Sequence, residues 1–188
     1  MNQKKNKLCL LWLPVLLVAI DQVTKFAVRK WLEPKEYITI IGKSVTFRYV
    51  ENRGAVWGIF QGKVDILSIV TVFMIALILL LIARIPSGKR FRPMLITMIV
   101  LFSGAFGNLI DRIFFHFVTD FISFDIINFP VFNVADIYVT CSAFVLLFLF
   151  CFYYKEEELS FLPFFGSEKK NEADDTNAAE NGQSDSSR

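Results

Sequence analysis

The sequence predicts a membrane α-helical protein with four transmembrane helices and a small extracytoplasmic β-sheet between the first two helices. Hydrophobic residues make up 54% of the 188-residue chain and Phe alone supplies 21 of them, which is unusual for a soluble domain. The mean hydropathy is +0.48, and much of the apolar content falls in long uninterrupted runs. A helix needs about 20 mostly apolar residues to cross a bilayer, and we find four runs that satisfy this requirement.

The first predicted span covers residues 8–28 and follows a cluster of lysines. A basic start and a short apolar run are also typical of a secretory signal peptide. No small-x-small cleavage site follows, so we interpret the segment as an uncleaved span. Asp21 and Lys25 interrupt it near its far end. They lie one helical turn apart, and an ion pair within the helix would make their burial tolerable.

The segment after the first span predicts β-structure. Residues 37–41 and 45–50 are rich in β-branched and aromatic side chains, and Gly42-Lys43-Ser44 separates them. This pattern is typical of two short strands around a turn. We expect the strands to form a small sheet on the outer surface of the membrane.

Three further spans complete the predicted domain, at residues 64–83, 94–113 and 134–154. The third span contains Ser103, Gly104 and Gly107, and small residues of this kind let neighbouring helices approach closely. We expect residues 1–165 to form one membrane domain. The remainder, residues 166–188, is rich in Asp, Glu, Asn and Ser and is predicted to be disordered.

Basic residues predict the orientation in the membrane. The connection at residues 84–92 carries four Arg or Lys residues and the N-terminus carries a lysine cluster, which favours the cytoplasm for both termini. The connection after the first span is also basic, so the two short, dense clusters decide the interpretation. In this orientation, five carboxylates collect near the outer ends of the spans: Asp21, Asp111, Asp120, Asp125 and Asp136.

Composition also excludes several kinds of site and partner. The net charge of +2 argues against a nucleic-acid partner. Cys9, Cys141 and Cys151 lie inside apolar runs, no CxxC or Cys/His cluster exists, and His116 is the single histidine. We therefore expect no disulfide framework, no metal site and no cofactor.

Two segments carry polar residues at helical spacing. Asn108, Asp111 and Arg112 fall on one helical face, although Asp111 and Arg112 could simply satisfy each other at the membrane interface. Asn133 suits the N-cap of the last span, and Asp136 three residues later completes a reciprocal capping pattern. This pattern indicates a well-capped helix, and a helix N-terminus also holds a carboxylate in a fixed place.

Taken together and in this order, five segments closely resemble lipoprotein signal peptidase (signal peptidase II) over roughly residues 8–155. The segments are Asp21-Gln22-x-Thr24-Lys25, Asn52-x-Gly54-Ala55, Gly104-Ala105-x-Gly107-Asn108-x-x-Asp111-Arg112, Val118-x-Asp120-Phe121 and Phe132-Asn133-x-Ala135-Asp136. The resemblance implies that Asp120 and Asp136 form a catalytic dyad. It implies that seven residues line or brace the site: Asn52, Gly54, Asn108, Asp111, Arg112, Asn133 and Ala135. Asp21 and Lys25 match a supporting pair, and the predicted sheet matches the family's cradle over the substrate.

The sequence departs from the family pattern at three places. Trp57 stands where Phe is usual and Ser103 where Gly is common, and both indicate altered packing more than altered chemistry. Asp125 is an additional nearby acid, so the loop carboxylate that faces Asp136 is open to question. Asp111 is the other competitor, and we rank it below Asp120 because Arg112 can neutralise it.

The resemblance also implies a substrate and a mechanism. The substrate would be a bacterial prolipoprotein bearing a diacylglyceryl group on its future N-terminal Cys, cleaved just before that Cys. The enzyme would lie among the lipids of the cell inner membrane, with its site at the extracytoplasmic face. Two close carboxylates share a proton, so one would activate water while the other polarises the scissile carbonyl. Which aspartate takes which part stays open at this stage.

Two other classes of membrane protein also use acidic residues at membrane depth. A small proton-coupled carrier would show internal repeats and broken helices near the midplane. We find no repeat, and the acids cluster at one end of the predicted spans. A non-catalytic assembly factor would not require both Asp120 and Asp136. The sequence therefore favours the peptidase.

Overall fold

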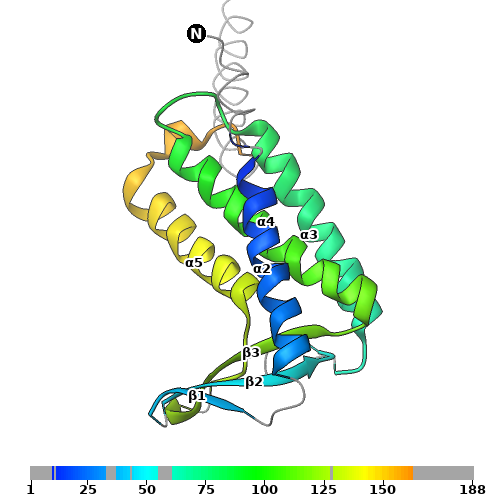
Figure 1. Cartoon of the computed structure of the whole chain (residues 1–188). Coiled ribbons are helices and arrows are strands. Elements are labelled where there is room, and N and C mark those ends of the chain that lie inside the picture. The colour runs from blue at the N-terminus through cyan, green and yellow to red at the C-terminus, as the bar shows by residue number, and fades with distance from the viewer. Residues whose placement is uncertain are drawn as a thin grey trace, which may run out of the picture.

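Four helices run alongside one another, and a small sheet lies across one end of them (Figure 1). The computed structural model describes residues 10, 12–32, 37–42, 44–54, 61–127 and 129–162. The helices are α2 (Trp12–Trp31), α3 (Val64–Arg84), α4 (Arg92–Phe115) and α5 (Val134–Phe148), the last continued by the π-helical turn η3 (Leu149–Tyr153). The strands are β1 (Ile38–Ile41), β2 (Val45–Asn52) and β3 (Val118–Phe124), with short 3-10 turns η2 (Asp125–Ile127) and η4 (Glu156–Leu159). The predicted disordered tail lies outside the described residues.

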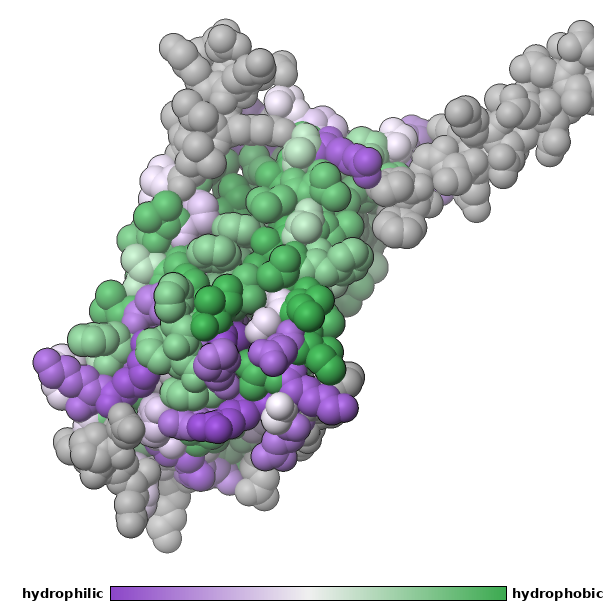
Figure 2. Space-filling model, turned by 90° about the vertical axis from the view of Figure 1, so that its right-hand side faces the viewer, coloured by the Kyte–Doolittle hydropathy of each residue, from purple (hydrophilic) through white to green (hydrophobic). Residues whose placement is uncertain are grey.

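Among the described residues, three helices are long and apolar enough to cross a membrane: Val64–Arg84, Arg92–Phe115 and Val134–Tyr153. They agree with the second, third and fourth predicted spans, and their apolar surface forms a broad band between more polar ends (Figure 2). Much of this band is unburied: Phe73 on α3, for example, is 68% exposed. The chain is an integral membrane protein.

The first predicted span is not confirmed by composition. Helix α2 is 20 residues long, but Asp21, Lys25, Arg29 and Lys30 interrupt its apolar sequence. The physical reason is that α2 turns its charges inward: the Asp21 and Lys25 side chains are fully buried. Its outward face carries Val15, Val23 and Phe26, which are all exposed.

The sheet has a third strand that the sequence analysis did not predict. Its order is β1-β2-β3, with antiparallel pairing throughout. The β1–β2 hairpin confirms the two predicted strands, but β3 comes from the connection between α4 and α5, so the sheet is not confined to one connection. The pairing of β2 with β3 sets Val50 opposite Asp120. The sheet therefore positions one of the two predicted catalytic carboxylates.

Small residues let α4 approach its neighbours, as predicted. A Cβ atom added at Gly104 would lie 2.5 Å from the Ala135 carbonyl oxygen on α5, and one at Gly107 would lie 2.6 Å from Asp21 Oδ2 on α2. Ser103 is buried beside them, and its hydroxyl donates to the Ile99 carbonyl of the same helix at 2.7 Å. These contacts draw α2, α4 and α5 together at the level of the polar site.

The opposite end of the bundle is closed by apolar packing and one ion pair. Met94 and Met98 on α4 pack with Leu159 in a buried cluster. Above this cluster, the Arg90 guanidinium pairs with the Glu158 carboxylate, with an Nε to Oε1 distance of 2.9 Å. The pair holds η4 against the start of α4, far from the sheet.

Candidate active site

The N-terminus of α5 is held by a reciprocal cap, as the sequence predicted. The Asn133 side-chain oxygen accepts from the Asp136 backbone N–H at 3.0 Å. In return, Asp136 Oδ2 accepts from the Asn133 backbone N–H at 3.1 Å. This local arrangement fixes the Asp136 carboxylate at the first turn of the helix.

The same asparagine reaches Asp120 on β3. Asn133 Nδ2 donates to Asp120 Oδ1 at 2.7 Å, and Asn52 Nδ2 donates to Asp120 Oδ2 at 2.9 Å. The Asn52 amide is oriented by the Gly54 backbone N–H, which donates to its oxygen at 3.0 Å. Asp120 is 2% exposed, so two side-chain amides replace the water that a carboxylate would otherwise bind.

Asn108 links Asp136 to a buried lysine. Its Nδ2 donates to Asp136 Oδ1 at 2.8 Å, while its Oδ1 accepts from Lys25 Nζ at 2.9 Å. The same oxygen accepts from Asn133 Nδ2 at 3.1 Å. Because the ammonium can only donate, it fixes the Asn108 amide with its NH2 group toward Asp136.

Lys25 lies between two fully buried carboxylates. Its Nζ atom is 3.0 Å from Asp21 Oδ2 and 3.5 Å from Asp111 Oδ2, so the ion pair predicted within α2 is present and extends to α4. Arg29 adds a longer contact, 3.7 Å from Asp111 Oδ2. The expectation that Arg112 neutralises Asp111 is wrong: among the described residues its ion-pair partners are Lys25 and Arg29.

The two buried carboxylates also fix the backbone beside the predicted dyad. Asp111 Oδ2 accepts from the Thr119 N–H at 2.9 Å, directly before Asp120. Asp21 Oδ1 accepts from the Ala135 N–H at 3.0 Å, directly before Asp136. Asp111 therefore lies behind β3 and braces it.

Asp120 and Asp136 line one cavity of about 590 Å³. Its polar wall also contains Asn52, Gly54, Asn108 and Arg112, and its apolar wall contains Val50, Val118, Phe129, Pro130, Val131, Phe132, Ile137 and Val139. The cavity thus joins a pair of carboxylates to a largely apolar surface, an arrangement suited to an extended or lipid-bearing ligand.

Burial and a like charge raise the pKa of Asp120. Loss of solvation is the larger cause and the nearby Asp136 charge adds to it, so the pKa rises to about 7, although hydrogen bonds from Asn52 and Asn133 oppose the rise. Near neutral pH, Asp120 is therefore poised to hold or release a proton. This behaviour is what general acid–base chemistry by a carboxylate pair requires.

Asp125 does not join this group. Its carboxylate accepts from the Thr46 hydroxyl at 2.6 Å and the Ser123 hydroxyl at 2.6 Å, and it pairs with Arg48. These contacts direct it toward β2, away from Asp136. The Trp57 departure lies outside the described residues.

Sequence reasoning missed the aromatic wall and the residues behind the carboxylates. Gln22 donates to Asp111 Oδ1 at 3.2 Å, and the Arg29 guanidinium donates to the Thr119 hydroxyl at 2.7 Å. Phe129 and Phe132 line the cavity from the loop before α5. Two of these features carried a usable signal: Phe132 directly precedes the predicted cap at Asn133, and Gln22 stands in the first of the family-like segments.

Comparison with known proteins identifies the family of the chain. A model of the family described as signal peptidase (SPase) II matches residues 13–152. The chain belongs to the signal peptidase II family. Membership of this family indicates a protease. Both predicted catalytic aspartates and all of the bracing residues fall inside the matched range.

Relatives in this signal peptidase II family cover most of the chain. A lipoprotein signal peptidase of Clostridium acetobutylicum is 43% identical over 126 residues, covering 65% of this chain and 80% of the relative. One from Fusobacterium nucleatum is 34% identical over 149 residues, covering 79% of this chain and 90% of the relative. A bacterial membrane enzyme solved by the in meso method at 1.9 Å superposes with a TM-score of 0.64 at 28% identity, covering 75% of this chain and 91% of that one.

Proposed function

We propose that the chain is an aspartic endopeptidase whose catalytic dyad is Asp120 and Asp136. The observation that carries this proposal is the position of both carboxylates on one cavity, bridged by Asn133. The pKa of about 7 at Asp120 supports it, because a pair that shares one proton at neutral pH supplies both an acid and a base.

The reaction requires one water molecule and one shared proton. The ionised carboxylate takes a proton from water as the water oxygen attacks the scissile carbonyl carbon. The protonated carboxyl donates to the carbonyl oxygen, and a tetrahedral intermediate forms. A proton then passes to the leaving amine, the C–N bond breaks, and the products are a carboxylic acid and an amine. The dyad titrates as a pair, so we assign the shared proton to both residues together.

The surrounding residues hold the dyad and the peptide. Asn52, Asn108 and Asn133 donate to the carboxylates and fix their orientation. Arg112 lines the cavity beside them and suits a peptide carbonyl or a developing negative charge. Gly54 and Ala135 brace through their backbones, and the buried Asp21, Lys25 and Asp111 support the residues that precede the dyad.

The proposed substrate is a prolipoprotein that carries a diacylglyceryl group, cut just before the modified Cys. The relatives' names support the prolipoprotein, and the apolar wall of the cavity supports a lipid-bearing segment. No metal takes part in the proposed reaction. The lipid would keep the substrate in the bilayer while the peptide bond reaches the dyad at the interface.

We further propose that α2 is a fourth membrane span and that the sheet faces the extracytoplasmic side of the bacterial inner membrane. Support for the span comes from its reversed polarity, with charged residues buried and apolar residues exposed. Support for the orientation comes from Arg84, Lys89 and Arg92 at the end opposite the sheet. Both termini would then lie in the cytoplasm.

A cleavage assay tests the proposed activity. Purified protein in lipid is mixed with a diacylglyceryl-modified prolipoprotein, and the products are separated by gel shift and weighed by mass spectrometry. We expect a product that begins at the lipidated Cys, and little or no cleavage of the same precursor without lipid. An intact lipidated precursor after incubation with folded protein would reject the peptidase and favour the carrier considered above.

A further inference from the structure

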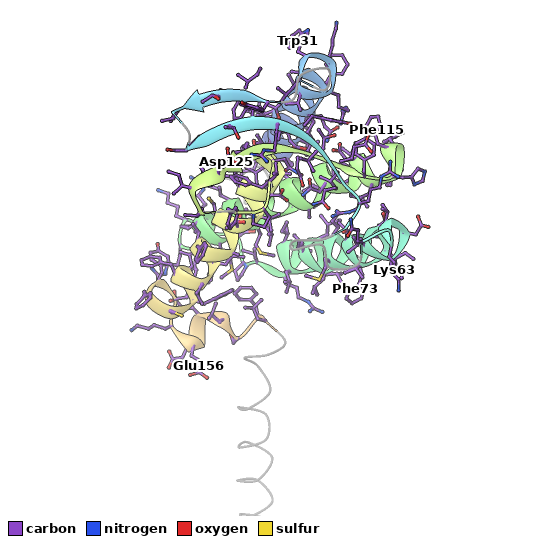
Figure 3. The ribbon with its side chains drawn as sticks, turned by 90° about the horizontal axis from the view of Figure 1, so that it is seen from below. Trp31, Lys63, Phe73, Phe115, Asp125 and Glu156 are labelled. Atoms are coloured by element: carbon purple, nitrogen blue, oxygen red, sulfur yellow. The ribbon has the colours of Figure 1, made fainter. Side chains whose placement is uncertain are left out.

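Asp125 forms a polar cluster with residues of the β1–β2 hairpin, beside which it lies in Figure 3. Its carboxylate accepts from the Thr46 hydroxyl on β2 and the Ser123 hydroxyl on β3, both at 2.6 Å, and pairs with Arg48 on β2. Its backbone N–H donates to the Ser44 carbonyl at 3.1 Å. One residue thus fastens the end of β3 to both the turn and the second strand of the hairpin.

The chain that follows Asp125 forms the apolar wall of the cavity. Residues 129–132 all line it, directly before Asn133. Their far end is held by Phe132, whose N–H donates to the Ile122 carbonyl at 3.0 Å while its carbonyl accepts from the Ile122 N–H at 2.8 Å. The Phe132 ring packs 5.3 Å from that of Phe124 and 5.7 Å from that of Phe129.

The wall is therefore a loop that is fixed at both ends. At one end Phe132 is hydrogen-bonded to β3. At the other end the Phe129 N–H donates to the Phe124 carbonyl at 3.4 Å, directly before the cluster of Asp125, Arg48, Thr46 and Ser123. We call these four residues the wall clasp. Its contacts do not include either dyad carboxylate.

We propose that Asp125 is a positioning residue that holds the Phe129–Phe132 wall through the wall clasp and thereby sets affinity for the substrate. The inference rests on the proposed function. It assigns the additional acid of the sequence to substrate binding, so it predicts an effect on KM and little effect on the chemical step.

The chemistry of the clasp favours an ionised acceptor. Hydrogen bonds from Ser123 and Thr46, followed by the charge of Arg48, lower the pKa of Asp125. An exposed ion pair alone contributes little, and the Arg48 side chain is 41% exposed. The clasp therefore depends mainly on the two hydroxyl donors. Replacing the carboxylate by an amide leaves the Thr46 hydroxyl, the Ser123 hydroxyl and the Arg48 guanidinium to compete for one oxygen.

The experiment compares Asp125→Asn with a matched control on the same sheet. Glu51→Gln removes another carboxylate that pairs with an arginine, Arg53, at 2.8 Å, and its partners Arg53 and Tyr49 belong neither to the wall clasp nor to residues 129–132. Steady-state cleavage gives KM and kcat for each variant, for Arg48→Met, and for the double variant Arg48→Met with Asp125→Asn. Hydrogen exchange at the Phe129 amide, which donates to the Phe124 carbonyl beside the clasp, follows the wall without any need for cleavage.

We expect Asp125→Asn to raise KM roughly five- to twentyfold with kcat nearly unchanged, the range expected when one member of a coupled network is lost. Arg48→Met should also raise KM. In free-energy terms, the effect of the double variant on KM should be smaller than the sum of the two single effects. Exchange at Phe129 should become faster, and Glu51→Gln should match the wild type in every measurement.

Several results would overturn the proposal. Identical KM for Asp125→Asn and Glu51→Gln would reject a role in binding, and a lower kcat at constant KM would place Asp125 in the chemistry instead. Unchanged exchange at Phe129 would reject the role of the clasp in holding the wall. If the wild type cleaves nothing, the proposed function fails, and exchange alone then decides whether the clasp exists.

Discussion

Asn133 contacts both carboxylates of the proposed dyad through its backbone N–H and its side-chain amide group. Its backbone N–H and side-chain oxygen bind Asp136, and its Nδ2 is shared between Asp120 and Asn108. The single residue therefore sets the separation of the two acids. Lys25 does not contact Asp136 through a hydrogen bond of its own. It donates to the Asn108 side-chain oxygen and so orients the amide that donates to Asp136.

The raised pKa of Asp120 predicts a pH-dependent stability. An acid whose pKa rises from 3.8 to about 7 on folding binds its proton more tightly in the folded chain, so the fold loses stability as pH rises across that window. Asp120→Asn removes this loss. The free energy of unfolding of Asp120→Asn, relative to that of the wild type, should therefore rise by about 1.4 kcal/mol per pH unit between pH 3.8 and about pH 7.

The measurement is thermal or chemical unfolding of both proteins in detergent at about pH 5 and about pH 8. Asp65→Asn on the exposed first turn of α3 serves as the control and should run parallel to the wild type. A difference between Asp120→Asn and wild type that stays constant with pH would show that Asp120 keeps an ordinary pKa.

Removal of the buried Lys25 ammonium should lower the free energy of unfolding. Lys25→Met leaves Asp21 and Asp111 buried without their shared partner, a situation that typically costs about 3–5 kcal/mol. Unfolding in detergent checks this value, with the exposed Lys30→Met as the control, which should change stability by less than about 0.5 kcal/mol. Equal stability of the two variants would mean that the carboxylates are neutral or solvated.

Sequence could predict the contacts within single segments but not those between them. The Asn133–Asp136 cap and the Asp21–Lys25 pair follow from spacing along one helix, and both are present. The contact of Lys25 with Asn108 joins residues that are 83 positions apart. Spacing rules carry no information on such a pair, so the partners of Asp111 were assigned wrongly.

At the scale of elements, the site is where two strands and three helices meet, with Asn52 supplied by β2 and Asp120 by β3. Helix α4 supplies Asn108 and approaches α5 closely at Gly104, and β3 brings Asp120 to the start of α5. The strand went unpredicted because Val118–Phe124 alternates only weakly and acquires its pairing from β2, far away in sequence. The hairpin strands, by contrast, are adjacent in sequence and were predicted.

The close approach of α4 and α5 predicts that a methyl group at Gly104 is poorly tolerated. A Cβ atom there meets the Ala135 carbonyl oxygen and Val139 Cγ2 at 2.5 and 2.8 Å, so Gly104→Ala should force the helices apart beside Asp136. We expect a loss of about 1–3 kcal/mol in unfolding free energy together with reduced cleavage.

The matched control is Gly88→Ala, because a Cβ atom at that glycine meets nothing within 4 Å. It should retain the stability and activity of the wild type. If Gly104→Ala behaves like Gly88→Ala, the helices are not packed as tightly as described.

At the scale of the whole molecule, polarity is divided along the bundle axis. The helices carry an apolar band, and the sheet lies across one end of them (Figures 1 and 2). Asp120 of the dyad belongs to that sheet, and the basic connection at residues 84–92 joins α3 and α4 at the other end. Apolar runs predicted four spans, and three of them are long and apolar enough in the described part of the chain. The charges of α2 are compensated by each other and by partners on α4, α5 and β3, which hydropathy does not detect.

The proposed orientation predicts which end can be labelled from outside the cell. In a variant without native cysteines, Tyr37→Cys beside β1 should react with a membrane-impermeant maleimide in intact cells. Ser87→Cys, exposed at the other end, should react only after the cells are opened. The reverse pattern would invert the orientation, and labelling of both positions from outside would reject the proposed number of spans.

The most direct test of the central claim is cleavage of lipidated prolipoprotein by Asp120→Asn, Asp136→Asn and the control Asp65→Asn. The account predicts that both dyad variants fold, bind the substrate and fail to cleave, with losses of at least about a thousandfold, while Asp65→Asn cleaves like the wild type. Cleavage by folded Asp120→Asn or Asp136→Asn at a rate near that of the wild type would contradict the dyad.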